Sequence, residues 1–169
     1  MEKTVIHLHT SFQIGKVDRR LFGGFLEHLG RAVYGGVYDP ESPSADPDGF
    51  RKDVMEALKG LRMTVMRYPG GNFASGYHWM DGTGKKEKQP AVLDLAWQSI
   101  ETNQFGTDEF IKLCRKMDWD PMITVNLGTG TPEEARNWVE YCNCPSGTRY
   151  AGLKWKQRSV WSKTLVFRK

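Results

Sequence analysis

The stretch Arg67-Tyr-Pro-Gly-Gly-Asn-Phe-Ala-Ser-Gly-Tyr-His-Trp79 is the most informative part of this chain. It follows a short apolar segment at 63–66 that is typical of a buried strand. Two glycines after a strand let the backbone turn sharply and approach a ligand closely. The stretch holds one amide, Asn72, among aromatic side chains, which suits a neutral polyhydroxylated ligand. A glycine turn with ordinary core aromatics is the alternative interpretation.

Apolar strand-like segments and helix-like segments alternate on both sides of this stretch. The apolar residues of 50–61 recur at helical spacing, and Thr131-Pro-Glu-Glu134 combines a hydroxyl cap, an early proline and acids in the first turn. In chain order the expected elements are strands at 21–26, 64–66 and 121–126, helices at 50–61, from Thr107 and from Thr131, and loops at 39–48 and 80–92.

This alternation predicts parallel strands joined by right-handed crossovers. An open doubly wound sheet and a (β/α)8 barrel both fit. No G-x-G-x-x-G follows the first strand, which argues against a dinucleotide-binding sheet. Polar and aromatic residues gather after the strand ends, where barrel active sites are built, so the barrel is favoured. Because a barrel needs about 250 residues, the 169 residues of this chain supply only about three of its βα units.

The N-terminal segment Val5-Ile6-His7-Leu8-His9 alternates between apolar and polar residues. The alternation predicts a half-buried strand with both histidines on one face. A metal site built from these two histidines is a much weaker interpretation than a solvated polar face.

Composition excludes several classes of protein. The chain has no apolar run of about 18 residues, which a membrane-spanning helix requires, and its start is too short and polar for a secretory signal. Its cysteines, Cys114, Cys142 and Cys144, are therefore expected to be reduced thiols, and Cys142-Asn-Cys144 lacks the spacing of a zinc site. We expect a cytoplasmic protein with no membrane partner, no metal and no cofactor.

The net charge of +4 comes from the C-terminal tail. Residues 154–169 hold six basic side chains and no acid, so the rest of the chain carries 18 basic against 20 acidic side chains. A nucleic-acid-binding tail is one interpretation and predicts steeply salt-dependent affinity. Because the body of the chain is not basic, we expect no nucleic-acid partner.

Four segments in order carry a resemblance to a known family. They are Phe22-Gly-Gly-Phe-Leu-Glu-His-Leu-Gly30, Arg67 to Trp79, Asp94-Leu-Ala-Trp-Gln-Ser-Ile-Glu-Thr-Asn103 and Pro121-Met-Ile-Thr-Val-Asn-Leu-Gly-Thr-Gly130. Together they resemble the intracellular α-L-arabinofuranosidases of glycoside hydrolase family 51. That resemblance implies a catalytic TIM barrel joined to a β-sandwich. It assigns residues 1–16 to a strand of the accessory sandwich, 17–153 to a partial barrel and 154–169 to a separate basic tail.

The resemblance also implies an activity, the retaining hydrolysis of terminal non-reducing α-L-arabinofuranosyl residues of arabinan and arabinoxylan oligosaccharides, within L-arabinose metabolism. Two carboxyl groups about 5 Å apart perform such a reaction. In the family both are glutamates that follow later strands, and neither position exists in this sequence. The chain alone is therefore expected to be inactive. Homo-oligomers are expected only of the intact protein.

The resemblance assigns roles to four residues. Glu27 matches a glutamate that binds sugar hydroxyls, Asn72 matches a second hydroxyl ligand, and Trp97 matches an aromatic wall of the terminal sugar's subsite. Arg67 matches an arginine close to the nucleophile, where a buried guanidinium keeps a carboxylate ionised.

Each assignment has an alternative. Glu27 could be the ion-pair partner of Arg67, and Trp97 could belong to the core. Asn126 is expected to support the site by holding a loop rather than by touching substrate. Two further loop residues, His28 and His78, have no assigned role.

The resemblance stops after Leu153, and the genetic code suggests a reason. Codons exist for 154–169 that, when read one nucleotide later, give a sequence ending in Gly-Asn and then a codon that can encode Glu, which is the family's acid/base motif. Trp155 and Trp161 each have a single codon, and both force glycine in the shifted frame. We expect a frameshifted and disordered tail, which the nucleotide sequence of the gene tests.

Two other functions are compatible with the sequence. One is a non-catalytic carbohydrate-binding or interaction module that uses Glu27, Asn72 and Trp97 and binds arabinose oligosaccharides by itself. The other is a fragment of a different, clan-related TIM-barrel glycosidase, because the later loops that select substrate are not in the sequence.

Overall fold

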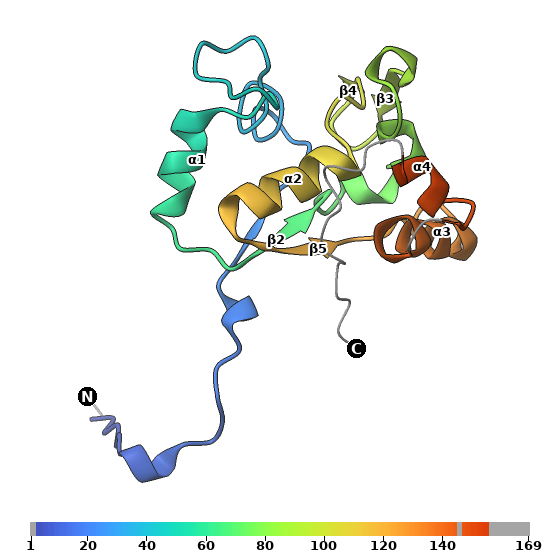
Figure 1. The fold of residues 1–169 in the computed structure, drawn as a ribbon. Helices are drawn as coiled ribbons and strands as arrows, with labels where there is room; N and C mark the ends of the chain where they lie inside the picture. The colour runs from blue at the N-terminus through green and yellow to red at the C-terminus, as the bar shows by residue number, and fades with distance from the viewer. Residues whose placement is uncertain (1–2, 145–146, 156–169) are drawn as a thin grey trace.

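The computed structural model describes residues 3–144 and 147–155 (Figure 1). At its centre lies a three-stranded sheet of β1 (Gly23–Phe25), β2 (Val65–Tyr68) and β5 (Asp120–Ile123), in the order β1-β2-β5. Both pairings are parallel, with Gly24 opposite Met66 and Met66 opposite Pro121. The parallel arrangement expected from the alternating elements is therefore confirmed.

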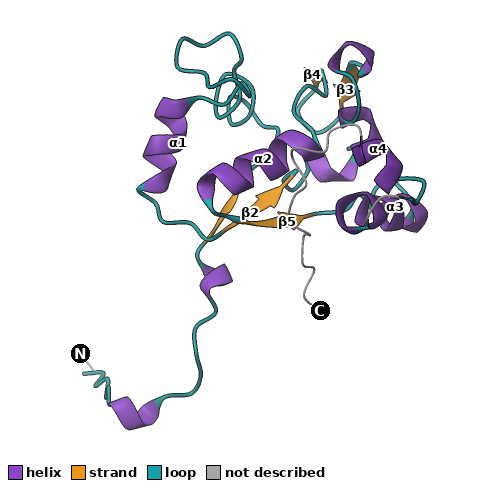
Figure 2. Cartoon of the chain, in the orientation of Figure 1, coloured by secondary structure: helices purple, strands orange, loops and turns teal. Residues whose placement is uncertain are grey.

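Helices connect and follow these strands (Figure 2). Helix α1 (Lys52–Lys59) lies between β1 and β2 in the chain, and α2 (Thr107–Met117) precedes β5. Helices α3 (Pro132–Asn143) and α4 (Ala151–Trp155) come after β5. The existence of the three longer helices agrees with the sequence pattern, whereas the short α4 was not predicted.

The observed starts of α2 and α3 can be compared with the caps that the sequence predicted. Helix α3 begins as expected, with the Thr131 hydroxyl accepting a hydrogen bond from the Glu134 amide at 3.1 Å. Helix α2 is capped one residue earlier than predicted, because the Gly106 amide donates to the Glu109 carboxylate at 2.9 Å. Thr107 is instead buried and accepts a hydrogen bond from the Trp138 indole at 3.0 Å.

A short antiparallel hairpin, formed by β3 (Val92–Asp94) and β4 (Ser99–Glu101), was not predicted. Its turn is held by Asp94, whose carboxylate accepts hydrogen bonds from the amides of Ala96 at 3.2 Å and Trp97 at 2.8 Å. Three-residue strands show too little alternation to be recognised from sequence. The expected loop at 80–92 contains two 3-10 turns, Trp79–Gly82 and Lys86–Lys88, before the hairpin begins.

The core is unusually rich in aromatic rings. Tyr68 from β2 stacks on Phe110 from α2, with ring centroids 4.6 Å apart, and Trp79 stacks on Trp138 from α3. Burial of each such ring stabilises the fold by about 1.5–3 kcal/mol. These contacts join β2 to α2 and the stretch after β2 to α3. The aromatics of 67–79 are thus largely core residues, as the alternative interpretation of that stretch held.

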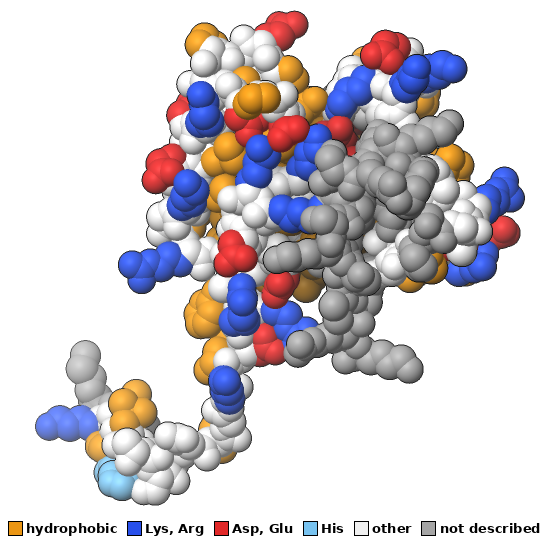
Figure 3. Space-filling model, viewed as in Figure 1, with side chains coloured by type: hydrophobic (Ala, Val, Ile, Leu, Met, Phe, Trp, Pro, Cys, Tyr) orange, Lys and Arg blue, Asp and Glu red, His pale blue; other side chains and the backbone are white. Residues whose placement is uncertain are grey.

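The predicted N-terminal strand is wrong for this structure. Residues 5–9 form no strand, and all five side chains are exposed. A 3-10 turn, Thr10–Phe12, follows. The segment runs away from the sheet, with apolar side chains on its surface (Figures 1 and 3). A strand needs a partner for its backbone groups, and none is present among the described residues. Membership of an accessory sandwich stays a prediction.

The remaining predictions concern chain segments and thiols. The frameshifted and disordered tail falls mostly on residues 156–169, outside the described residues. Within 3–144 and 147–155, no helix is long and apolar enough to cross a membrane. Cys114 forms no disulfide and is buried, and burial raises the pKa of its thiol.

Candidate functional site

The candidate site lies where the carboxyl ends of the three parallel strands meet. Glu27 follows β1, the glycine stretch follows β2, and Asn126 follows β5. Because parallel strands end at the same edge of a sheet, residues distant in sequence come together there.

Glu27 is bound to the glycine stretch. Its Oε1 atom accepts hydrogen bonds from the amides of Gly71 at 2.8 Å and Phe73 at 3.0 Å. The two chains approach so closely that a Cβ atom on Gly70 would lie 2.3 Å from the Glu27 Cγ atom, and Gly70 has φ of +118°. Glycine is therefore required at position 70 both for space and for its backbone conformation.

Arg67 does not pair with Glu27. Its Nε atom donates to the Thr124 hydroxyl at 2.8 Å, and its guanidinium lies 4.9 Å from the centre of the Phe25 ring. The matching role assumed a buried guanidinium, but the Arg67 side chain is only half-buried. The ion-pair alternative for Glu27 is thus not realised among the described residues.

Asn72 and Trp97 are both accessible. Asn72 precedes the 3-10 turn Phe73–Ser75, is exposed, and makes no side-chain hydrogen bond within the described residues. Trp97 lies in the turn of the β3–β4 hairpin with 36% of its surface exposed and is not part of the core cluster. The hydrogen bonds that Glu27 accepts hold the loop of Asn72 next to Glu27. Among the described residues, no hydrogen bond or ring contact joins Trp97 to Glu27 or to Asn72.

Asn126 is fully engaged by its own loop and by the stretch that follows β2. Its amide nitrogen donates to the Tyr77 carbonyl at 3.1 Å and to the Thr129 hydroxyl at 3.0 Å. Its Oδ1 atom accepts from the amides of Gly128 and Thr129, each at 3.0 Å. These bonds favour a loop-holding role over contact with a ligand.

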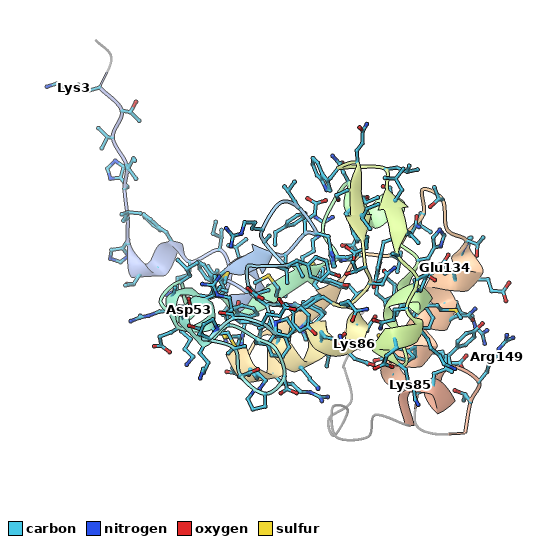
Figure 4. All side chains as sticks on the ribbon, turned by 90° about the horizontal axis from the view of Figure 1, so that it is seen from above. Lys3, Asp53, Lys85, Lys86, Glu134 and Arg149 are labelled. Carbon is cyan, nitrogen blue, oxygen red and sulfur yellow. The ribbon has the colours of Figure 1, made fainter. Side chains whose placement is uncertain are left out.

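The two histidines without an assigned role are both paired with glutamates. His28 is buried, and its Nδ1 atom lies 2.8 Å from the Glu101 Oε2 atom. His78 is exposed and lies 3.0 Å from the Oε1 atom of Glu134, at the start of α3 (labelled in Figure 4). Sequence reasoning missed the His28–Glu101 pair because its partners are 73 positions apart, and no local pattern connects them.

Glu101 is a strongly bonded buried carboxylate. Burial alone would raise its pKa, but hydrogen bonds from His28, Tyr34 and the Asn103 amide hold the pKa below its usual range. The neighbouring carboxylate in turn raises the pKa of Tyr34, which burial has already raised. Tyr34 therefore acts only as a donor to Glu101 at ordinary pH.

A pocket of about 250 Å³ lies beside these residues, between the hairpin and the loops that follow β2 and β5. Its lining includes Phe73, Tyr77, Asp81, Leu93, Asp94 and Thr129. Burial raises the pKa of Asp81. Glu27, Asn72 and Trp97 do not line this pocket. Among the described residues, no group of three or more histidine, cysteine, aspartate or glutamate side chains could hold a metal ion.

Comparison with known proteins places this chain in a family. A family model described as the alpha-L-arabinofuranosidase 1 domain matches residues 57–158. The chain belongs to this family. It is 54% identical over 151 residues to a protein named probable alpha-L-arabinofuranosidase C from Aspergillus flavus, covering 89% of this chain and 30% of that protein.

A bacterial relative and a solved structure support the same conclusion. The intracellular exo-alpha-(1->5)-L-arabinofuranosidase 1 of Bacillus subtilis is 50% identical over 154 residues, which are 91% of this chain and 31% of that protein. The GH51 α-L-arabinofuranosidase of Thermotoga petrophila superposes with a TM-score of 0.81 at 51% identity, covering 87% of this chain and 30% of that structure. The chain thus spans about 30% of the length of these relatives and has the mixed α/β fold of their N-terminal region.

Proposed function

We propose that this arabinofuranosidase-family chain carries part of the sugar-binding site of a retaining α-L-arabinofuranosidase, on the first βα units of a (β/α)8 barrel. The observation that carries the proposal is the hydrogen-bonded contact between Glu27 and the backbone of Gly71 and Phe73. This contact fixes the loop on which Asn72 is exposed. The parallel strand order β1-β2-β5 with intervening helices supports the barrel.

Each candidate residue supplies a different interaction to an arabinofuranosyl group. Only Oε1 of Glu27 is used by the loop, so Oε2 can accept a hydrogen bond from a sugar hydroxyl. Asn72 offers an amide that can both donate and accept. Trp97 offers an indole face against which a sugar ring can pack. Arg67 and Asn126 support the site without contacting the sugar. Arg67 does so through its hydrogen bond to Thr124, and Asn126 through the hydrogen bonds that hold its loop.

The same chain is expected to bind but not to hydrolyse. A retaining glycosidase needs a nucleophilic carboxylate and an acid/base carboxyl about 5 Å apart. The family's two catalytic glutamates have no counterpart among these 169 residues. The substrate of the intact enzyme is proposed to be the terminal arabinofuranosyl group of arabinan or arabinoxylan oligosaccharides. The names of the relatives support arabinofuranosyl specificity.

Two further proposals concern the location and the assembly of the protein. The word intracellular in the name of the Bacillus subtilis relative supports a cytoplasmic location. A homo-oligomer is proposed for the intact protein only.

Binding tests this proposal. Isothermal titration of the purified chain with methyl α-L-arabinofuranoside should give saturable binding, and Asn72→Ala should weaken it about 3- to 10-fold, as loss of one hydrogen bond predicts. Gln13→Ala removes another exposed amide, far from the strand ends, and is the matched control. Equal affinity in wild type and Asn72→Ala would remove Asn72 from the site.

A further inference from the structure

The three candidate sugar contacts come from three separate segments of the chain. Glu27 follows β1, Asn72 lies in the loop after β2, and Trp97 lies in the turn of the β3–β4 hairpin. Hydrogen bonds from the amides of Gly71 and Phe73 to the Glu27 carboxylate hold the first two segments together. Something else must set the position of the hairpin relative to them.

The His28–Glu101 pair joins the hairpin to the strand end. The side chains of His28 and Glu101 are only 3% and 5% exposed. Glu101 is the last residue of β4, and His28 is the neighbour of Glu27. The 2.8 Å contact between them therefore ties the base of the hairpin directly to the segment that carries Glu27.

The imidazole of His28 also contacts the loop after β2. It stacks on the Phe73 ring, with centroids 4.4 Å apart and planes inclined by 8°. The Phe73 amide is one of the two that donate to Glu27. His28 thus touches the loop that presents Asn72, and its Nε2 atom lies 3.3 Å from the hydroxyl of Tyr68 at the end of β2.

The second oxygen of Glu101 is bound as firmly as the first. Oε1 accepts hydrogen bonds from the Tyr34 hydroxyl and from the Asn103 amide at 2.6 Å. Both carboxylate oxygens are therefore directed by fixed donors. Replacing a buried ion pair by apolar side chains of similar size is often neutral for stability, so a buried pair is weak evidence of a stabilising role.

We propose that His28 and Glu101, supported by Tyr34, are positioning residues that set the Trp97 hairpin against the Glu27–Asn72 loop. The proposal rests on the proposed function, because it gives the pair a purpose only if these segments bind sugar. It also makes a separate physical claim, namely that the pair limits the mobility of the β3–β4 hairpin.

The first test compares two tyrosine variants that each remove a hydroxyl donor from a buried carboxylate. Tyr34→Phe removes the donor to Glu101, and Tyr141→Phe removes the donor to Asp108, 2.8 Å away between α2 and α3. We expect Tyr34→Phe to speed hydrogen exchange of the Ala96 and Trp97 amides at least tenfold. Tyr141→Phe should leave these amides unchanged. Equal hairpin exchange in the two variants would overturn the proposal.

The second test separates positioning from stability. The double variant His28→Leu/Glu101→Leu replaces the pair by apolar side chains. With 5-fluorotryptophan incorporated, we expect the ¹⁹F resonance of Trp97, assigned with Trp97→Phe, to shift and broaden even where the urea midpoint matches that of wild type. An unchanged Trp97 resonance in a variant of equal midpoint would show that the pair is only structural. If the double variant does not fold, the tyrosine comparison still decides.

Sugar binding is read out separately. Tyr34→Phe is expected to weaken binding of methyl α-L-arabinofuranoside about 3- to 10-fold, while Tyr141→Phe retains wild-type affinity. If the wild-type chain binds no arabinofuranoside, the proposed function fails. Hairpin exchange and the Trp97 resonance would still confirm or overturn the positioning role.

Discussion

Replacement of Glu27 by alanine tests the contact on which the candidate site depends. The change leaves the amides of Gly71 and Phe73 without their acceptor. Hydrogen bonds to a charged group contribute about 1.5–3 kcal/mol each. Because Glu27 is half-buried, water can replace part of this interaction, and the low end of the range applies. We expect Glu27→Ala to lower the free energy of unfolding by roughly 2–3 kcal/mol.

Urea denaturation followed by tryptophan fluorescence measures this loss, with a thermal melt as a second readout. A change of this size in a protein of this length lowers the Tm by roughly 5–10 °C. Glu27→Gln retains an oxygen acceptor and should lose about half as much. Glu56→Ala is the control, because it removes only an exposed ion pair with Lys59, which contributes less than about 0.5 kcal/mol.

Unfolding of Glu27→Ala and Glu56→Ala at the same urea concentration with the same slope would contradict this expectation. Such a result would mean that the loop after β2 holds its shape without Glu27. The exposed position of Asn72 would then need another cause.

Further predictions concern the loop, a helix cap and acid stability. Gly70→Ala should destabilise the fold by more than about 2 kcal/mol, because its Cβ would collide with Glu27 and φ is positive. Gly76→Ala, which meets nothing within 4 Å, should be close to neutral in the same urea melts. Thr131→Ala should cost about 1 kcal/mol through loss of the α3 cap, measured by urea melts. The folded-state pKa of Glu101 is lowered, so its contribution is present above the unfolded pKa of about 4.3 and disappears as pH falls through the folded pKa. The stability difference between wild type and Glu101→Gln should therefore shrink in melts below about pH 4.

The parts of the fold that sequence predicted are those with strong local signals. Thr131 and the proline after it specify the start of α3 whatever surrounds them. The parallel strands followed from their alternation with helices. By contrast, the hairpin β3–β4 ends at Glu101, which contacts His28 across 73 positions of sequence, and local sequence cannot reveal such a contact. The alternation at Val5–His9 misled because a strand forms only where a partner strand exists.

The sugar-binding roles of the candidate residues stay predictions, and the contacts that assemble the candidate site were not predicted. The resemblance assigned sugar-binding roles to Glu27, Asn72 and Trp97. In the structure Glu27 and Asn72 follow β1 and β2, and Trp97 lies in the turn of the hairpin. The resemblance did not indicate that one carboxylate oxygen of Glu27 accepts hydrogen bonds from the backbone of the glycine stretch. Nor did it indicate that His28, unassigned from sequence, would be buried among aromatic rings beside it.

The most direct test of the central claim is an NMR titration of the ¹⁵N-labelled chain with methyl α-L-arabinofuranoside, with free arabinose monitored in the same tube. We predict saturable shifts of the Gly70–Phe73 amides and of the Trp97 indole, with no arabinose released. Shifts confined to other regions, or none at millimolar ligand, would contradict the assignment of a sugar site to these residues. Release of arabinose would contradict the claim that this chain lacks the catalytic pair.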